Sequence, residues 1–202
     1  MTTKWTSKRS PNLKIDRESM HRSALLFVTC TVALTLGCSS QPQTEFRPTS
    51  TVKDIMDAVI DPSADALWDS VEVIATLQGT ERKAPNTEND WKALRRHAVS
   101  LVEASNLLLI PGRHIARPGE KADDARVELQ PEDIEALLAK DPAAWALRAH
   151  WLHDAATQSL KAVDARDATA LMNAGETLDT SCENCHRNYW YRTPPPDSTA
   201  GR

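Results

Sequence analysis

The sequence predicts an all-α protein whose helices pack as a bundle, and three observations support this class. The 202 residues include only six glycines and two phenylalanines, whereas the good helix formers Ala, Leu, Glu and Arg are common. No stretch alternates apolar and polar residues over the length of a strand. Apolar residues instead recur at intervals of three and four in four blocks, as in helices that bury one face.

The four blocks end at residues that favour helix boundaries, and a short fifth segment follows Pro131. Asp61 and Pro62 interrupt the first block, so we expect a break or kink there. Residues 113–130 are polar and form a longer connection than bundles usually have. The expected helices cover 51–78, 87–110, 141–163 and 167–192.

The N-terminal part has the features of an export signal. Six basic residues lie within 1–22, and the uncharged run "SALLFVTCTVALTLG" follows. A basic region before a short apolar region is typical of a signal peptide, and this run is too short to span a bilayer comfortably. We predict a signal peptide at 1–37, for which Met20 offers an alternative start.

The end of this run, "LTLGC", resembles the lipobox of bacterial lipoproteins, although Thr35 stands where that pattern prefers Leu. The resemblance implies that Cys38 becomes the lipid-bearing N-terminus and that Ser39 does not oblige retention in the inner membrane. We therefore expect a protein anchored on the periplasmic side, with the outer membrane favoured, through a flexible tether at 38–50. An ordinary signal peptide with an incidental Cys38 is the alternative.

The charge of the exported part is negative. Residues 38–202 carry 18 basic and 26 acidic residues, a net charge of −8. This balance argues against a nucleic-acid partner. A basic protein partner is compatible with it, but a solvated helical surface explains it equally well.

Two cysteines remain for the folded part, and they belong to the sequence "CENCH" at 182–186. Two thiols one helical turn apart can add to the two vinyl groups of a haem, and the imidazole that follows can bind its iron. This is the attachment pattern of haem c. A thioredoxin-like pair would need a preceding strand, a zinc site would need two further ligands, and a disulfide would close too small a loop to stabilise much.

The motif continues the apolar face of the last expected helix. Its members recur at the same intervals of three and four, which points the motif into the bundle. That face consists of Leu171, Ala174, Leu178, Cys182, Cys185 and Tyr189.

The stretch "CENCHRNYWYR", placed at the end of the helical region, resembles the class II cytochromes c, the group of cytochrome c prime and cytochrome c-556. The resemblance covers 51–192 in helix order and implies an antiparallel four-helix bundle with one covalently bound haem near the C-terminus. Tyr189 matches the aromatic residue usual three positions after the histidine, which implies that it contacts the haem, whereas Trp190 stands where a basic residue is usual. Residues 193–202, which begin "TPPP", are expected to be a tail that does not pack.

The resemblance also implies that a residue of the first helix covers the haem face opposite His186. The candidate is Met56, which we expect to be the second iron ligand; core packing is its alternative role. Met172 lies fourteen residues before His186 on one helix, about 21 Å away, and is excluded. Four further histidines are weaker alternatives: His97, His114, His150 and His153.

These expectations favour an electron-transfer protein with His/Met iron. A five-coordinate haem that binds a gas such as NO or CO is the alternative, and a lipoprotein whose haem only stabilises the bundle is a third reading. No nucleophile–base pattern suggests an enzyme. The redox partner is not specified by the sequence, and a homodimer is an assembly that the resemblance allows.

Overall fold

The structure is a computed structural model that describes residues 45–192. The expected signal peptide (1–37), Cys38 with the first part of the expected tether, and the expected tail (193–202) lie outside these residues. The elements in chain order are α2 (Val52–Ile55), η1 (Met56–Ile60), α3 (Asp61–Trp68), β1 (Glu72–Thr76), β2 (Gly79–Lys83), α4 (Glu88–Leu107), α5 (Pro131–Lys140), α6 (Pro142–Ala165) and α7 (Ala168–Tyr189).

The segments α2, η1 and α3 form one continuous helix over 52–68, the first helix. Thr51 caps its start, and the Asp54 carboxylate accepts a bond from the Thr51 N–H in return. The helix does not break at Pro62, one of the two outcomes expected there, because it continues through this residue. Pro62 has no N–H to donate, and the π-helical turn η1 precedes it, with the Asp61 N–H bonded to the Met56 carbonyl five residues back.

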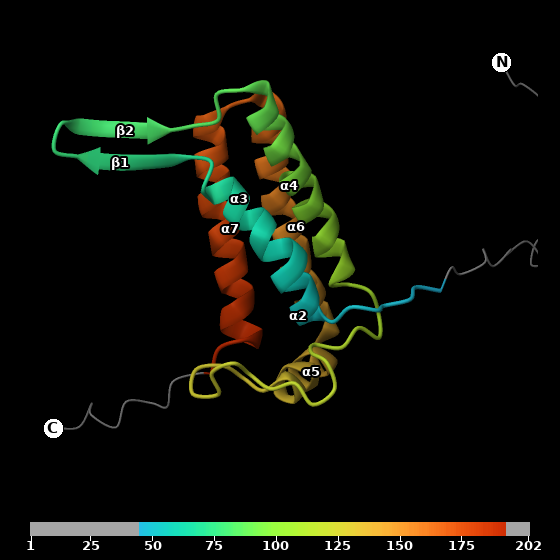
Figure 1. Cartoon of the computed structure of the whole chain (residues 1–202). Coiled ribbons are helices and arrows are strands. Elements are labelled where there is room, and N and C mark those ends of the chain that lie inside the picture. Colours follow the sequence, from blue (N-terminus) through green and yellow to red (C-terminus); the bar gives the residue numbers. More distant parts are fainter. Residues whose placement is uncertain (1–44, 193–202) are drawn as a thin grey trace, which may run out of the picture. The chain divides into compact units, whose positions relative to one another are not determined.

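The prediction of an all-α protein was also wrong, because the fold contains a two-stranded antiparallel sheet. Strands β1 and β2 pair with Glu72 opposite Lys83 and Thr76 opposite Gly79. Three of the five residues of β1 are β-branched, and Gly79 adopts a φ of 135°, which favours glycine and suits a tight turn. Residues 69–78, expected to be helical, therefore form the lead-in, the first strand and the turn of a hairpin over 72–83 that projects away from the helices (Figure 1), and the fold class is mixed.

The other predicted helices were confirmed to within a few residues. Thr87 caps α4, Asp141 caps α6 and Asp167 caps α7, each by accepting backbone N–H groups of the first turn. The first helix, α4, α6 and α7 pack side by side, each running opposite to the one before (Figure 1). Their shared core contains Leu101 and Leu178, both fully buried.

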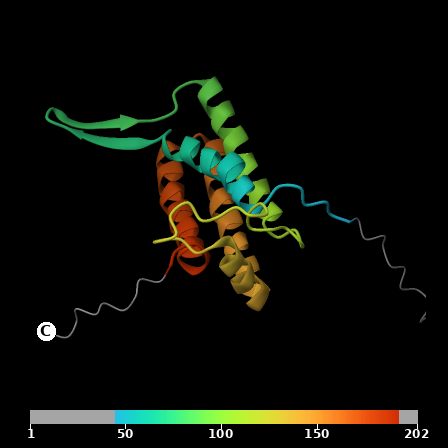
Figure 2. The same ribbon diagram turned by 60° about the horizontal axis from the view of Figure 1, so that its bottom comes forward.

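The long connection between α4 and α5 crosses one end of the molecule (Figure 2). Its first part is bonded to the start of the first helix, since the Val52 N–H donates to the His114 carbonyl over 2.9 Å. Its last part is bonded to the end of α7, since the Leu129 N–H donates to the Trp190 carbonyl over 2.8 Å. The connection therefore ties the start of the first helix to the end of α7, the helix that carries the C-terminal motif.

Candidate functional site

The C-terminal motif borders a cavity of about 310 Å³ between the first helix, α6 and α7. Helix α7 contributes Cys182, Cys185 and His186 from its last two turns. The first helix forms the facing wall, α6 forms a third side and Leu108 closes the space. The volume lies at the lower end of the range for cofactor and ligand pockets.

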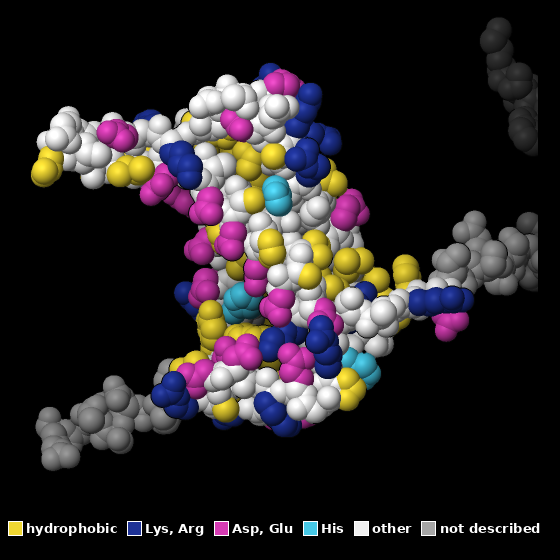
Figure 3. Space-filling model, in the orientation of Figure 1, with side chains coloured by type: hydrophobic (Ala, Val, Ile, Leu, Met, Phe, Trp, Pro, Cys, Tyr) yellow, Lys and Arg dark blue, Asp and Glu magenta, His cyan; other side chains and the backbone are white. Residues whose placement is uncertain are grey.

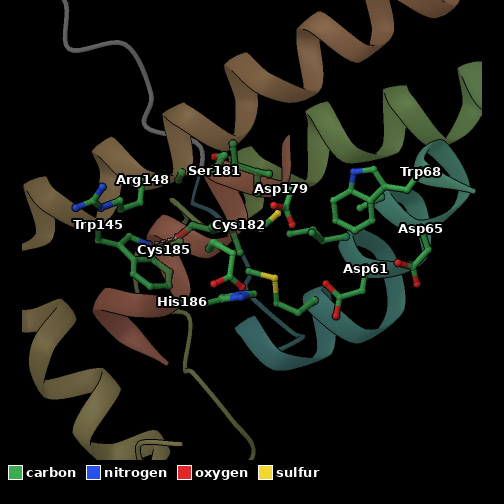
Figure 4. A pocket seen from close by; sticks show the side chains of 17 residues that line it. Asp61, Asp65, Trp68, Trp145, Arg148, Asp179, Ser181, Cys182, Cys185 and His186 are labelled. Atoms are coloured by element: carbon green, nitrogen blue, oxygen red, sulfur yellow. Dashed lines mark hydrogen bonds between the residues drawn. The ribbon is translucent and has the colours of Figure 1, made fainter. Parts of the chain in front are cut away.

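The close-up view shows how the labelled side chains are arranged (Figure 4). Cys182, Cys185 and His186 extend from α7 into the space that the other two helices border. The side chains of α6 and of α3 that line this space come from opposite sides of it: Trp145 and Arg148 from α6, and Asp61, Asp65 and Trp68 from α3.

Met56 lines the same cavity, from the π-helical turn η1. The structure thus brings together four of the five residues for which the sequence predicted iron or haem contact, namely Met56, Cys182, Cys185 and His186, and their roles in binding stay predictions. Of the histidines within 45–192, His186 alone lines the cavity. His114, for example, lies in the connection between α4 and α5, and its Nδ1 lies 3.1 Å from the carboxylate of Glu135 in α5.

Tyr189 is placed differently from the prediction, because it does not line the cavity. It is buried, with 8% of its surface exposed, and packs edge-to-face on Trp145 with ring centroids 5.1 Å apart. The Trp145 indole N–H donates to the Leu108 carbonyl over 2.9 Å. Tyr189 therefore supports the wall that Trp145 and Leu108 form.

The two thiols are free and half-buried. Burial, with a smaller contribution from Asp61, raises the pKa of Cys182 to about 12. Burial likewise raises the pKa of Cys185 to about 11, against the opposing effect of Arg148. Both groups are therefore protonated thiols at neutral pH. A thioredoxin-like pair relies on a lowered thiol pKa, so this environment argues against that reading.

The side chains at the cavity fit iron that a porphyrin already binds through four nitrogens better than they fit a bare metal ion. Within the described residues no group of three or more His, Cys, Asp or Glu side chains could hold a bare metal ion. The imidazole of His186 and the thioether of Met56 line the cavity. Both kinds of group serve as axial ligands of iron in haem proteins. The Ser181 hydroxyl, in a residue 7% exposed, lines the cavity without a hydrogen-bond partner in the structure, as is expected where a bound group completes a wall.

Several lining residues were missed by sequence reasoning. Asp61 is one of three carboxylates spaced four apart on the first helix, a pattern that reads as a solvated face. Burial raises the pKa of Asp61, His186 opposes this effect, and the neighbouring carboxylates Asp57 and Asp65 add to it. Asp61 and Asp65 are indeed exposed to solvent, and they also border the cavity.

Trp68 was missed as well, although a signal for it was present. Its indole N–H donates to the Gly175 carbonyl over 3.0 Å. A Cβ at Gly175 would lie 3.1 Å from Trp68 Cδ1, so the glycine permits this close approach. Glycine in a helix interior is unfavourable, and Gly175 within a predicted helix indicated such a contact.

No helix within residues 45–192 is long and apolar enough to cross a bilayer. Comparison of the chain with family models, with curated proteins and with solved structures found no match.

Proposed function

We propose that the chain is a c-type cytochrome that transfers electrons through one haem, attached by Cys182 and Cys185 and bound by His186 and Met56. The observation that carries this proposal is the single cavity lined by all four residues. Haem iron, when bound there, supplies one-electron redox chemistry.

The residues of the chain suit this role in three respects. The thiols are free and protonated, which is the form that thioether attachment consumes. Buried apolar side chains, among them Ile60 and Leu152, exclude water from the cavity walls. A thioether opposite His186 favours the reduced state of iron and raises its reduction potential.

We further propose that the protein is exported and held at the periplasmic side of a membrane, the outer membrane in particular, by lipid on Cys38. Its partners are then redox proteins and the membrane itself. Mass spectrometry of the membrane fraction tests this proposal, since the first peptide should begin at Cys38 and carry the mass of a diacylglyceryl group. A soluble product cut at another residue would contradict it.

The axial ligand is tested by Met56→Leu, with Met172→Leu as the matched control. We expect ferric low-spin iron in the unmutated protein, with the weak far-red absorption band of a thioether bound to iron, and slow binding of CO. Met56→Leu should abolish the band, shift the iron toward high spin and lower the reduction potential, whereas the bundle stays folded because the exchange nearly conserves volume. Met172 lies on α7 about 21 Å from His186 along the axis, so its substitution should change none of these properties. High-spin iron in the unmutated protein would contradict His/Met ligation and favour gas binding.

A further inference from the structure

A second hollow lies beside the first helix, and we call it the groove. Its volume is about 590 Å³, and Val59 faces it from the first helix. Figure 3 shows hydrophobic side chains gathered beside the place where the N-terminal segment leaves the helices. Two of the large apolar side chains in its lining are substantially exposed, Phe46 at 63% and Leu107 at 38%. The apolar lining of the groove is Phe46, Val59, Ala104, Leu107, Leu109, Ile110 and Pro111, and its polar members are Ser100, Glu103 and Asn106.

Hydrogen bonds fix the start of the described chain at this groove. The Arg113 guanidinium donates through Nε to the Leu107 carbonyl over 2.9 Å and through Nη1 to the Ser50 carbonyl. The end of α4 and the segment before the first helix are thus joined by one side chain. Phe46 lies four residues before Ser50, so the chain reaches the groove directly from its N-terminal side.

The length of chain between Cys38 and Phe46 limits how far the groove can lie from an anchor. Eight residue steps separate them, which span at most about 28 Å when fully extended. If Cys38 carries lipid, Phe46 must lie within that distance of the bilayer surface.

We propose that the groove docks on the surface of the lipid bilayer that holds the anchor. This inference rests on the lipid anchor in the proposed function. Phe46 and the aliphatic residues supply an apolar surface for the acyl boundary, and Arg47 and Arg113 stand next to them, where basic side chains attract phosphate headgroups. A protein held by two membrane-binding elements is attached more firmly than one held by a single lipid group. In this proposal the lipid on Cys38 is the first element and the groove is the second.

This docking leaves the candidate redox site accessible. The groove and the cavity share no lining residue. Val59 belongs to the groove, whereas Met56 and Ile60 belong to the cavity. The α6 and α7 walls of the cavity therefore contribute no residue to the surface that contacts lipid.

The test uses the full-length, lipid-bearing protein in vesicles of phosphatidylethanolamine and phosphatidylglycerol. A nitroxide label is placed at Leu107→Cys, and a matched label at Leu147→Cys, an exposed position on α6 that lines neither hollow. The collision rates of each label are measured with oxygen, which concentrates in lipid, and with a polar nickel chelate, which does not enter it. We expect the label at position 107 to gain oxygen collisions and lose nickel collisions on vesicle binding, and the label at position 147 to change little.

Three outcomes would overturn the proposal in distinguishable ways. If the protein floats with the vesicles but the label at position 107 stays as accessible to nickel as the label at position 147, the groove does not contact lipid and the anchor alone holds the protein. If the protein does not float with vesicles, the anchor in the proposed function is wrong and the docking falls with it. Spin–spin broadening at position 107 with a loss of both nickel and oxygen collisions would show that a second copy covers the groove, which also contradicts docking on lipid.

Discussion

The cavity and the groove border the same helix, but their chemistry differs. The cavity holds two thiols, an imidazole and four carboxylates, and arginine from α6. The groove holds apolar side chains with a single carboxylate, that of Glu103. One side of the first helix thus faces residues that can bind a redox group, and another side faces residues that can only pack or dock.

The π-helical turn η1 helps to separate these two sides. In a regular α-helix, residues three apart lie on nearly the same face. A π-helical turn, closed by a bond five residues back, contains more residues than an α-helical turn. Each residue therefore turns the chain by a smaller angle about the helix axis, and three residues fall further short of a full rotation. Val59 is therefore turned further from Met56 than an α-helix would allow, and the two residues line different hollows.

The largest expected effect is on the cavity. Replacing both thiols, Cys182→Ser with Cys185→Ser, should abolish the haem-dependent peroxidase stain of the denatured protein on a gel, because no sulfur remains to hold the group covalently. Met56→Leu is the control and should keep the full stain, since it removes an axial ligand and no attachment. Haem that acid acetone extracts from the unmutated protein would contradict thioether attachment.

The packing around the two hollows should differ in its contribution to stability. Leu178 is fully buried one turn before Cys182, so Leu178→Ala should lower the free energy of unfolding by about 3 kcal/mol. Leu107 is 38% exposed at the groove, and Leu107→Ala should cost less than about 1 kcal/mol. Urea denaturation of the two variants measures both values. Equal losses would show that the groove is part of the core and is not free to dock.

These regions also differ in how far the sequence predicted them. The chemistry of the motif at 182–186 can be predicted from its five residues alone. Helices α4, α6 and α7 were predicted from the periodicity of apolar residues and from the capping residues. The hairpin was missed because Leu67, Val71 and Ile74 continue the helical spacing, although the β-branched residues of β1 favour a strand. The groove has no local signal, since it forms only where Val59 meets the end of α4.

The carboxylates of the cavity were missed for a related physical reason. Asp61 and Asp65 lie at intervals that place them on one side of a helix, and acidic residues on a helix usually face water. Only the position of α7 decides that this side borders the cavity. The periodicity of apolar residues therefore predicted the helices, but it could not predict which helices distant in sequence contact one another.

The smallest expected effect concerns the helix that both hollows share. Asp54 closes the capping box at its start, and the Thr51 backbone N–H, the Thr51 hydroxyl and the Arg117 guanidinium hold the pKa of that carboxyl below its ordinary value of 3.8. A carboxyl whose pKa is lower in the folded than in the unfolded chain stabilises the fold above the unfolded value, and this contribution is lost as the pH falls through the folded value. Asp54→Asn should therefore lower the melting temperature slightly at neutral pH, and the difference from the unmutated protein should vanish in acid.

Asp90 provides the matched comparison, because it closes the second capping box, at the start of α4. Thr87 and the Asn86 N–H lower the pKa of its carboxyl, without a guanidinium among its partners. Asp90→Asn should therefore shift the melting temperature less than Asp54→Asn, and added salt should reduce the gap between the variants by screening the Arg117 pair. A salt-independent gap would show that the caps alone set the two effects. If Asp90→Asn lowered the melting temperature more than Asp54→Asn does, the Val52–His114 backbone bond would be the main contact that holds the start of the first helix. The wall between the cavity and the groove would then not depend on the charge of Asp54.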